Sequence, residues 1–466
     1  MRTTQCVRAG WVMGALGACM LVAGAARADV TTQRPGSILI FPKVVNDGTR
    51  DTVIQITNTS NSLDTARCFY LAGQLGANGL PLCSETDFFI NLTRQQPTIW
   101  RASTGRGQFS SDGLSPGQVP PVPLGFTGAL ICAEVDSSLE APVAKNALKG
   151  EATLLSATSD DQSKYNGIAF LGGAANDGDN VLNLDSSEYN ACPAGSRVDF
   201  IASDAEDPVI DSLGNAGRCS LAGVLTATPC NTTANCTGGQ ICSTGQCSNG
   251  AACNVDADCT TGTCAPLTGV TTNVTVLPCN LDLNALVPTA VSLVLSGKDT
   301  EQSTLSGSKT MSCWESFAID TSASCAGGYG RVCLTRPNTT FASVDITSGR
   351  GGPVIAVAEA FHTDSVGHTS TAAVNLHVEG QCVGACTAPS LGVPCLTSAV
   401  CGAGTCTGVT SIGSECNSNA DCGGGLCSGP RFCSGGTDAG QACTADANCT
   451  GGTCPLPSAR IHLPGA

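Results

Sequence analysis

The chain has 466 residues, a formal net charge of −15 at pH 7, 42% hydrophobic residues and 30 cysteines. An acidic surface repels the phosphates of nucleic acids and the head groups of anionic membranes, so we expect neither as a partner. Aromatic residues make up 4% of the chain, whereas glycine occurs 56 times, which is typical of short strands joined by many turns. This length and composition predict a mainly β protein with several domains.

Residues 1–28 have the features of an export signal. Arg2 and Arg8 supply positive charge, an apolar stretch of about 15 residues follows, and residues 26–28 (Ala-Arg-Ala) are the kind that signal peptidases recognise. That stretch is shorter than the ~20 residues of a membrane-spanning helix, and no later segment is comparably apolar. We expect a protein that is secreted or held on the outer cell surface without a membrane span. The short signal and the few lysines suggest a bacterial source.

Residues 29–175 predict a β-sandwich. Runs of five to eight strand-forming residues alternate with Gly, Asn, Asp and Pro turns, and Ile54 and Ile56 lie on one face of such a run. The predicted strands are 37–41, 52–57, 67–71, 87–93, 99–100, 129–135 and 151–155.

Residues 280–380 have the same texture and predict a second sandwich. Its predicted strands, the first of which precedes that range, are 271–277, 290–295, 310–319, 341–347, 353–361 and 371–378. We expect residues 176–218 to be a linker or to supply edge strands. Residues 219–279 hold nine cysteines and residues 381–466 hold twelve, so we interpret them as a Cys-rich insertion and a Cys-rich tail.

The Cys-rich segments contain an internal repeat. Five copies share two cysteines separated by five residues, with Ala two positions before the second cysteine and usually Asn or Asp directly before it. A Gly and a third cysteine follow in each copy. The copies begin at Cys230, Cys253, Cys395, Cys416 and Cys443, and the first copy adds Cys247.

These repeats predict small modules held together by disulfides. Units this short cannot bury a core, so they need covalent staples, and a disulfide contributes roughly 2–4 kcal/mol. The Asn or Asp is suited to capping backbone N–H groups, and the Gly to a positive φ. Zinc is disfavoured because the chain has no Cys-x-x-Cys, and none of its four histidines lies among the clustered cysteines.

We therefore expect the cysteines to form disulfides, although the sequence leaves their connectivity open. Proximity alone favours Cys68–Cys83 and then Cys325–Cys333 outside the repeats. The cysteines expected in disulfides are Cys68, Cys83, Cys230, Cys236, Cys242, Cys247, Cys253, Cys259, Cys264, Cys325, Cys333, Cys395, Cys401, Cys406, Cys416, Cys422, Cys427, Cys443, Cys449 and Cys454.

Two resemblances follow from these patterns. The spacing of Cys230, Cys236, Cys242 and Cys247 is similar to that of the N-terminal cysteine-rich region of Dickkopf-type secreted proteins, and more loosely to disintegrin- and EGF-like modules. The resemblance covers about 110 residues and implies extracellular interaction modules, with nothing that matches the second Dickkopf domain. The β regions resemble the immunoglobulin-like domains of bacterial exported proteins in texture. The expected fold is therefore mainly β, with two immunoglobulin-like β-sandwiches and small disulfide-rich, loop-dominated modules.

An acidic turn is the best candidate for a metal site. Asp177, Asp179, Asn180 and Asp185 cluster in a segment rich in turn residues, and calcium prefers carboxylate and carbonyl oxygens on such turns. The same residues are common in ordinary turns, and the EF-hand pattern is absent. Calcium is thus a possible cofactor and no other is expected. Asp204, Glu206, Asp207 and Asp211 form a weaker acidic cluster.

Catalytic patterns are incomplete. The Gly113-x-Ser-x-Gly117 match has Pro116 after the serine, and proline lacks the N–H that an oxyanion hole needs. Ser306 and Lys309 match Ser-x-x-Lys without its companion motifs. His362, His368 and His377 lack the spacings of metal-binding histidines.

We expect a non-catalytic secreted or cell-surface protein, structural or adhesive, that contacts an extracellular protein or a glycan. One alternative is a secreted β-sandwich hydrolase that uses paired carboxylates such as Glu134 and Asp136, which share a strand face if the strand is regular. Another is a small disulfide-rich inhibitor or ligand carried by the C-terminal repeats.

Overall fold

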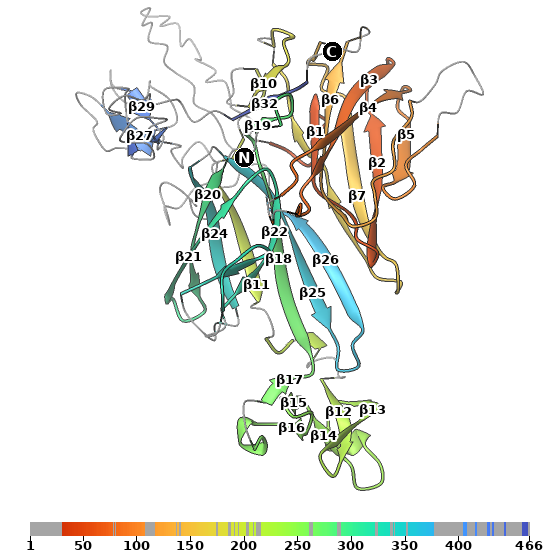
Figure 1. The fold of residues 1–466 in the computed structure, drawn as a ribbon, viewed down its shortest axis with the longest axis vertical. Helices are drawn as coiled ribbons and strands as arrows, with labels where there is room; N and C mark the ends of the chain where they lie inside the picture. The colour runs from red at the N-terminus through yellow and green to blue at the C-terminus, as the bar shows by residue number, and fades with distance from the viewer. Residues whose placement is uncertain are drawn as a thin grey trace, which may run out of the picture.

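The computed structural model describes most of the chain from residue 30 to residue 376, and then parts of the C-terminal region. The gaps are 78, 80, 108–116, 137, 139–140, 174–175, 185–187, 191, 194, 202–204, 208, 211–215, 261–263, 287–289, 322–324, 336–338, 340 and 351–352. Farther on it describes strand backbones at 404–407, 415–416, 426–428, 431–432 and 442–443, and then residues 459–464. The fold is mainly β, with antiparallel sheets and small disulfide-rich sheets, as predicted (Figure 1).

The first sandwich spans residues 30–170. Strands β4, β3, β6, β1 and β9 form one layer, and β5, β2, β7 and β8 form the other. The layers enclose a core that includes Ile54, Tyr70 and Trp100. The strands are β1 (Ile38–Asn46), β2 (Arg50–Asn58), β3 (Asp64–Ala72), β4 (Glu85–Leu92), β5 (Pro97–Arg101), β6 (Phe126–Val135), β7 (Leu148–Ser156), β8 (Gln162–Asn166) and β9 (Ile168–Phe170).

Strand β1 explains the continuous apolar run near the N-terminus. All nine of its residues are buried, because Leu39 and Phe41 face the core while Ile38 and Ile40 face a second cluster outside the sandwich. The core disulfide joins Cys68 of β3 to Cys132 of β6, which are paired directly in the same sheet. The predicted pair Cys68–Cys83 is therefore wrong. In antibody domains, by contrast, the conserved disulfide links the two sheets.

The second sandwich packs two sheets with the orders β11-β24-β20-β21 and β23-β22-β18-β25-β26 around a separate core. Two of its strands, β11 and β18, precede residue 280. The predicted strand 310–319 is wrong as a single element, since Ser312 to Trp314 separate β21 from β22. The strands are β11 (Gly195–Ile201), β18 (Gly269–Pro278), β20 (Val291–Asp299), β21 (Thr304–Met311), β22 (Glu315–Asp320), β23 (Arg331–Cys333), β24 (Phe341–Arg350), β25 (Val354–Thr363) and β26 (Thr369–Asn375).

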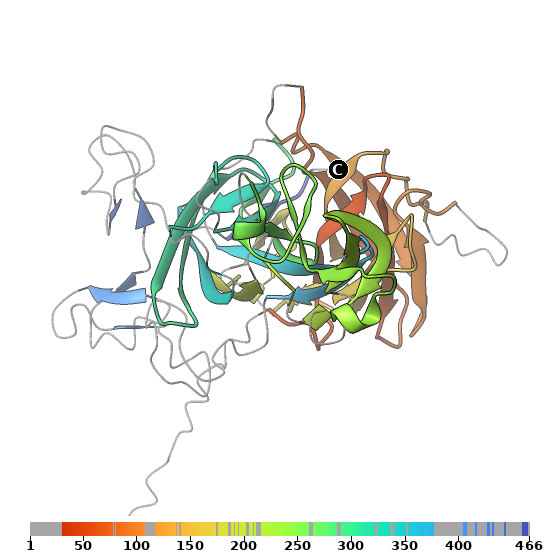
Figure 2. The same cartoon turned by 90° about the horizontal axis from the view of Figure 1, so that it is seen from below.

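The two sandwiches lie side by side and are fastened together (Figures 1 and 2). Cys83 of the first forms a disulfide with Cys313 of the second, and the neighbouring Trp314 donates its indole N–H to the Pro42 carbonyl at 2.7 Å. The ammonium group of Lys43 forms a buried ion pair with Glu359. A second ion pair joins Arg50 Nη1 to Glu359 Oε1 at 3.0 Å. These covalent and polar contacts fix how the domains are oriented.

A small sheet near the C-terminus ties three distant segments together. Strand β32 (Arg460–His462) lies between β10 (Val181–Asn183) and β19 (Leu281–Asp282), and its Ile461 is fully buried. The predicted C-terminal tail therefore returns to the body of the protein. Just beyond β32, the Pro464 carbonyl accepts a hydrogen bond of 2.8 Å from Arg67 in the first sandwich.

Candidate functional site

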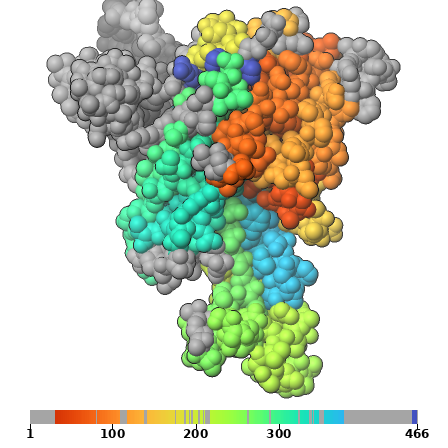
Figure 3. All heavy atoms as spheres, viewed as in Figure 1, coloured from red at the N-terminus to blue at the C-terminus, as the bar shows by residue number. Residues whose placement is uncertain are grey.

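Residues 217–268 form a separate projection at one end of the molecule, which we call the tip module (Figure 3). It contains two repeat units, each built from a small three-stranded sheet and a short 3-10 helix. The first unit comprises β12 (Gly217–Leu221), β13 (Val224–Cys230), η1 (Thr233–Asn235) and β14 (Ile241–Ser243), and the second comprises β15 (Gly245–Cys247), β16 (Ala252–Cys253), η2 (Asp256–Asp258) and β17 (Cys264–Pro266).

Each unit contains four cysteines joined first to third and second to fourth. The pairs are Cys219–Cys236 and Cys230–Cys242 in the first unit, and Cys247–Cys259 and Cys253–Cys264 in the second. The three-cysteine copies seen in the sequence thus lack their first member, and Cys247 opens the second unit instead of closing the first. All eight sulfur atoms are in disulfides, which indicates an oxidising compartment.

The same backbone register recurs in the C-terminal region. In each unit of the tip module, the residue two positions before the first cysteine is the strand partner of the unit's second cysteine, as in Gly217↔Cys230 and Gly245↔Cys253. The corresponding pairs farther along are Gly404↔Cys416 and Arg431↔Cys443. By this rule Cys406 begins a unit, although the sequence alignment made it the last cysteine of the copy that starts at Cys395.

The residue before the third cysteine of each unit caps a turn, as the sequence predicted. The side chain of Asn235 accepts hydrogen bonds from the N–H groups of Asn231 and Thr232 at 3.1 and 2.9 Å. Asp258 does the same for Asn254 and Val255, and these N–H groups hold the pKa of its carboxyl below the usual value. Polar caps of this kind support the turn beside the disulfides, which form the small buried core of the first unit.

The two units are docked on each other. The N–H of Ala252 in the second unit donates to the Gly223 carbonyl in the turn of the first at 2.8 Å, and the Thr244 N–H donates to the Asn254 side chain at 2.8 Å. Ala222 and Gly223 both have positive φ angles, of 51° and 77°, as a tight hairpin turn requires. The tip module is therefore a single rigid body.

The second sandwich holds the tip module through the β25–β26 hairpin. Nδ1 of His362 lies 2.6 Å from a carboxylate oxygen of Asp207, which is fully buried, and the hydroxyl of Ser365 donates to the Gly217 carbonyl at 2.8 Å. On the return path, the N–H of Val270 donates to the Ala205 carbonyl at 3.1 Å. Both connections to the module are thus fixed by hydrogen bonds.

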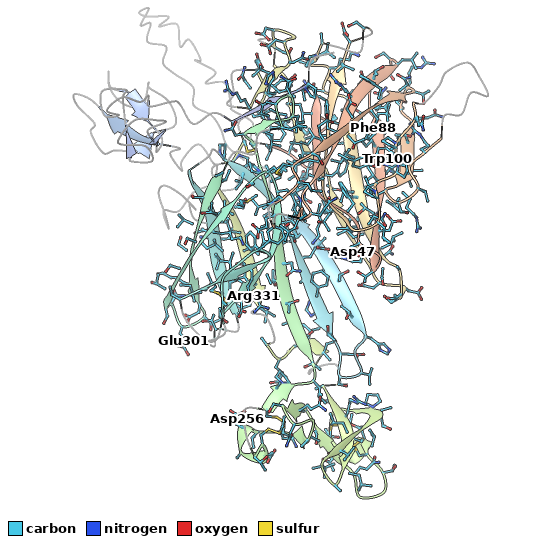
Figure 4. The ribbon with its side chains drawn as sticks, in the orientation of Figure 1. Asp47, Phe88, Trp100, Asp256, Glu301 and Arg331 are labelled. Atoms are coloured by element: carbon cyan, nitrogen blue, oxygen red, sulfur yellow. A yellow bond between two sulfur atoms is a disulfide. The ribbon has the colours of Figure 1, made fainter. Side chains whose placement is uncertain are left out.

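The tip module exposes four aliphatic side chains among small and polar residues. Leu221, Val224, Ile241 and Val255 are 51%, 67%, 52% and 57% exposed. Leu221 and Val224 flank the turn that contacts the second unit, and Val255 lies three residues after that contact at Ala252. The tip module contains no aromatic residue and no Lys, and its charged residues are Arg218, Asp256, which is labelled in Figure 4, and Asp258. The module presents apolar groups and a slight negative charge.

A carboxylate that the sequence did not indicate, that of Glu188, lies beside the predicted calcium turn. Carboxylate oxygens of Asp177, Asp179 and Glu188 lie within 4.8 Å of one another. Burial, followed by the two aspartates, raises the pKa of Glu188. The Asn180 side-chain oxygen is buried with no hydrogen-bond partner among the described residues, while Asp185 lies outside them. Calcium binding here stays a prediction, with Glu188 added to the groups that would hold the ion.

Glu134 and Asp136, the carboxylates considered for a hydrolase, have separate structural contacts. Glu134 is fully buried, and its oxygens accept the backbone N–H groups of residues 145–147 at 2.6–2.9 Å. Burial, together with the charge of Asp64, raises the pKa of Glu134 to about 8. Asp136 follows the end of β6 and accepts the Ser138 N–H at 3.0 Å. These contacts give Glu134 the role of anchoring a loop.

The Ser-x-x-Lys match and the histidines do not come together in one site among the described residues. Ser306 and Lys309 lie three residues apart on strand β21, so their side chains leave opposite faces, which does not produce the helical Ser-x-x-Lys arrangement. His362 contacts Asp207, and His368 contacts Asp364 at 3.1 Å. His377, Ser115, Asp204 and Asp211 lie outside the described residues.

Eight disulfides join the described cysteines, including the predicted Cys325–Cys333, and such a number is typical of proteins in oxidising, extracellular surroundings. Within the part of the chain described, no helix has the length and apolar character needed to cross a membrane. Comparison with protein-family models and with curated protein sequences found no match to either.

Proposed function

We propose that this is an exported, non-catalytic binding protein that displays its tip module to a protein partner. The observation that carries the proposal is the exposure of Leu221, Val224, Ile241 and Val255 on a rigid, disulfide-bonded module at one end of the molecule. Aliphatic groups fixed in place lose little conformational entropy on binding, which favours association. The resemblance to Dickkopf-type cysteine-rich regions supports an extracellular interaction.

A protein fits this surface better than a glycan does. Sugar-binding surfaces commonly use aromatic rings against the C–H faces of the sugar, and residues 219–268 contain none. The module has one cation, Arg218, which donates to the Thr226 carbonyl, and so it has no cluster of cations for an acidic polysaccharide. The exposed aliphatic side chains complement apolar groups of another protein, and Asp256 and Asp258 complement a basic rim.

The rest of the fold supports this display role. The Lys43–Glu359 ion pair and the Cys83–Cys313 disulfide hold the sandwiches in one orientation. Ser365 in turn holds the tip module at Gly217, and His362 contacts Asp207 in the segment that leads to the module. A partner bound at the tip would therefore be held at a fixed distance from the opposite end, as suits an adhesive or structural protein.

The test compares Val224→Asp with Val374→Asp. Val374 on β26 is 58% exposed, so both variants place a carboxylate at a similarly exposed valine. The labelled mature protein is titrated onto cells of the source organism, intact or treated with protease. We expect Val224→Asp to weaken binding at least tenfold, because an unpaired charge would be buried at the interface, and protease to abolish binding. Binding that survives protease, or that responds equally to both variants, would contradict the proposal.

A further inference from the structure

A second site lies where the two sandwiches meet, away from the tip module. A hollow of about 930 Å³, which we call the junction hollow, is lined by residues of β21, β23 and the turn at 327–330, together with Gly79 and Pro81 of the first sandwich. This volume falls within the range of about 300–1,000 Å³ that is typical of small-ligand sites, and domain junctions are common places for them.

The charged groups of the junction hollow are already neutralised. Lys309 Nζ lies 2.6 Å from Glu315 Oε1, and Arg331, which is labelled in Figure 4, lies 3.0 Å from Asp320. Each cation therefore has a carboxylate partner, so the lining offers no surplus charge for a phosphate or a carboxylate ligand. Arg331 is half exposed, and a guanidinium has five N–H groups, which leaves donors available for a neutral ligand.

Hydroxyl groups dominate the remaining polar lining. They belong to Ser312 and Thr335, whereas Ser306, Ser308 and Thr310 border the hollow from β21 with side chains on the face opposite to Lys309. Each hydroxyl can both donate and accept a hydrogen bond, which matches the dual character of sugar hydroxyls. Glycines at 327 and 328 add no side chains and have open space beside them, so a ligand can approach the backbone closely.

Tyr329 provides a fixed aromatic surface. The residue is 42% exposed, although its hydroxyl donates to the Gly73 carbonyl at 2.8 Å. Burial, followed by the charge of Glu315, raises the pKa of Tyr329 to about 12, so the phenol keeps its proton. The Cys325–Cys333 disulfide closes the turn that carries it, which keeps the ring ordered before any ligand arrives.

An extended peptide is the other ligand that this place could take. Because Ser306 pairs with Thr335 at the edge of β21, the alternation of an antiparallel strand directs the backbone groups of Ser308 and Thr310 toward the junction hollow. However, Lys309 points inward between them toward Glu315. Inward-pointing charges on edge strands are a recognised guard against the addition of another strand.

We propose that the junction hollow binds a neutral saccharide, with the Tyr329 ring against the C–H face of the sugar and the surrounding hydroxyls and Arg331 bound to its rim. The site is independent of the protein partner proposed for the tip module. Its ligand would be a segment of an uncharged polysaccharide.

The test screens the mature protein against an array of neutral glycans, acidic glycans and extended peptides, and measures the hits by calorimetry. Tyr329→Ala should weaken neutral-glycan binding about tenfold, because ring contacts of this kind contribute on the order of 1 kcal/mol. Tyr329→Phe should retain it. Phe341 on β24 is 44% exposed, so Phe341→Ala serves as the matched control and should change binding less than twofold.

Arg331→Ala provides a second variant if Tyr329→Ala does not fold, since it removes the half-exposed guanidinium that lines the hollow, and it should also weaken binding. Val224→Asp should bind the glycan normally, which separates this proposal from that of the tip module. Retention of acidic glycans or peptides in place of neutral glycans would overturn the inference. So would the absence of any neutral-glycan hit, or binding that Tyr329→Ala and Arg331→Ala both leave intact.

Discussion

The ion pair between the sandwiches offers the sharpest test of the fold, through Glu359→Gln. The side chains of Lys43 and Glu359 are 3% and 1% exposed, and Arg50 approaches the same carboxylate at 3.0 Å. Burial lowers the pKa of Lys43, whereas Lys43 and Arg50 together outweigh the effect of burial on Glu359 and leave its pKa below the usual value. The substitution therefore leaves a buried ammonium without its counter-charge.

We expect Glu359→Gln to lower the free energy of unfolding by about 3–5 kcal/mol, the range for removing one member of a buried pair. Adding Lys43→Met should recover part of this loss, because it removes the stranded charge. The matched control is Glu151→Gln, whose partner Lys164 lies 2.7 Å away in an exposed pair, and it should cost under about 1 kcal/mol.

The assay is equilibrium unfolding in urea with the disulfides kept oxidised. Trp314 reports on the junction and Trp100 on the first core, so tryptophan fluorescence follows both regions. Equal losses for Glu359→Gln and Glu151→Gln, or a larger loss for the double variant than for Glu359→Gln alone, would refute the reasoning.

Three further predictions follow. The pKa of Glu359 is lower in the folded protein than in the unfolded chain. Its contribution to the free energy of unfolding is therefore complete above its unfolded pKa of about 4.3, and it disappears as the pH falls through its folded pKa. The stability difference between wild type and Glu359→Gln should therefore shrink below about pH 4, and unfolding curves that show a constant difference down to pH 2 would contradict this. A Cβ at Gly73 would overlap the Trp314 indole, so Gly73→Ala should lower the unfolding midpoint by the equivalent of about 1–3 kcal/mol, while Gly269→Ala, where the space is open, should not. The register shared by the repeat units predicts the disulfides Cys406–Cys422, Cys416–Cys427, Cys433–Cys449 and Cys443–Cys454, and non-reducing peptide mapping that finds Cys395–Cys406 instead would disprove the rule.

Local sequence predicted the features that depend on local forces. The runs of strand-forming residues in the first sandwich became β1 to β7, because their apolar side chains pack on the faces of a pleated sheet. The repeat motif correctly predicted the Asn235 and Asp258 caps, since donor and acceptor lie within four residues of each other. Residues 176–218 were expected to be a linker or to supply edge strands, and β11 is an edge strand of the second sandwich.

Features set by distant partners could not be predicted in this way. The break between β21 and β22 falls at Cys313 and Trp314, which bind Cys83 and Pro42 more than 200 residues earlier in the chain. Proximity suggested Cys68–Cys83, but β3 lies beside β6 in the sheet and so brings Cys132 to Cys68. The junction hollow likewise combines segments whose proximity no motif encodes.

Strand β32 changes what the second Cys-rich block can do. Because Arg460–His462 pairs with β10 on one side and β19 on the other, the block is attached to the body of the protein at both of its ends. The block is therefore a long loop of the chain. A free tail would be shed by a single proteolytic cut. Here one cut leaves both halves attached, so release of the repeats as a diffusible fragment requires two cuts or the extraction of β32.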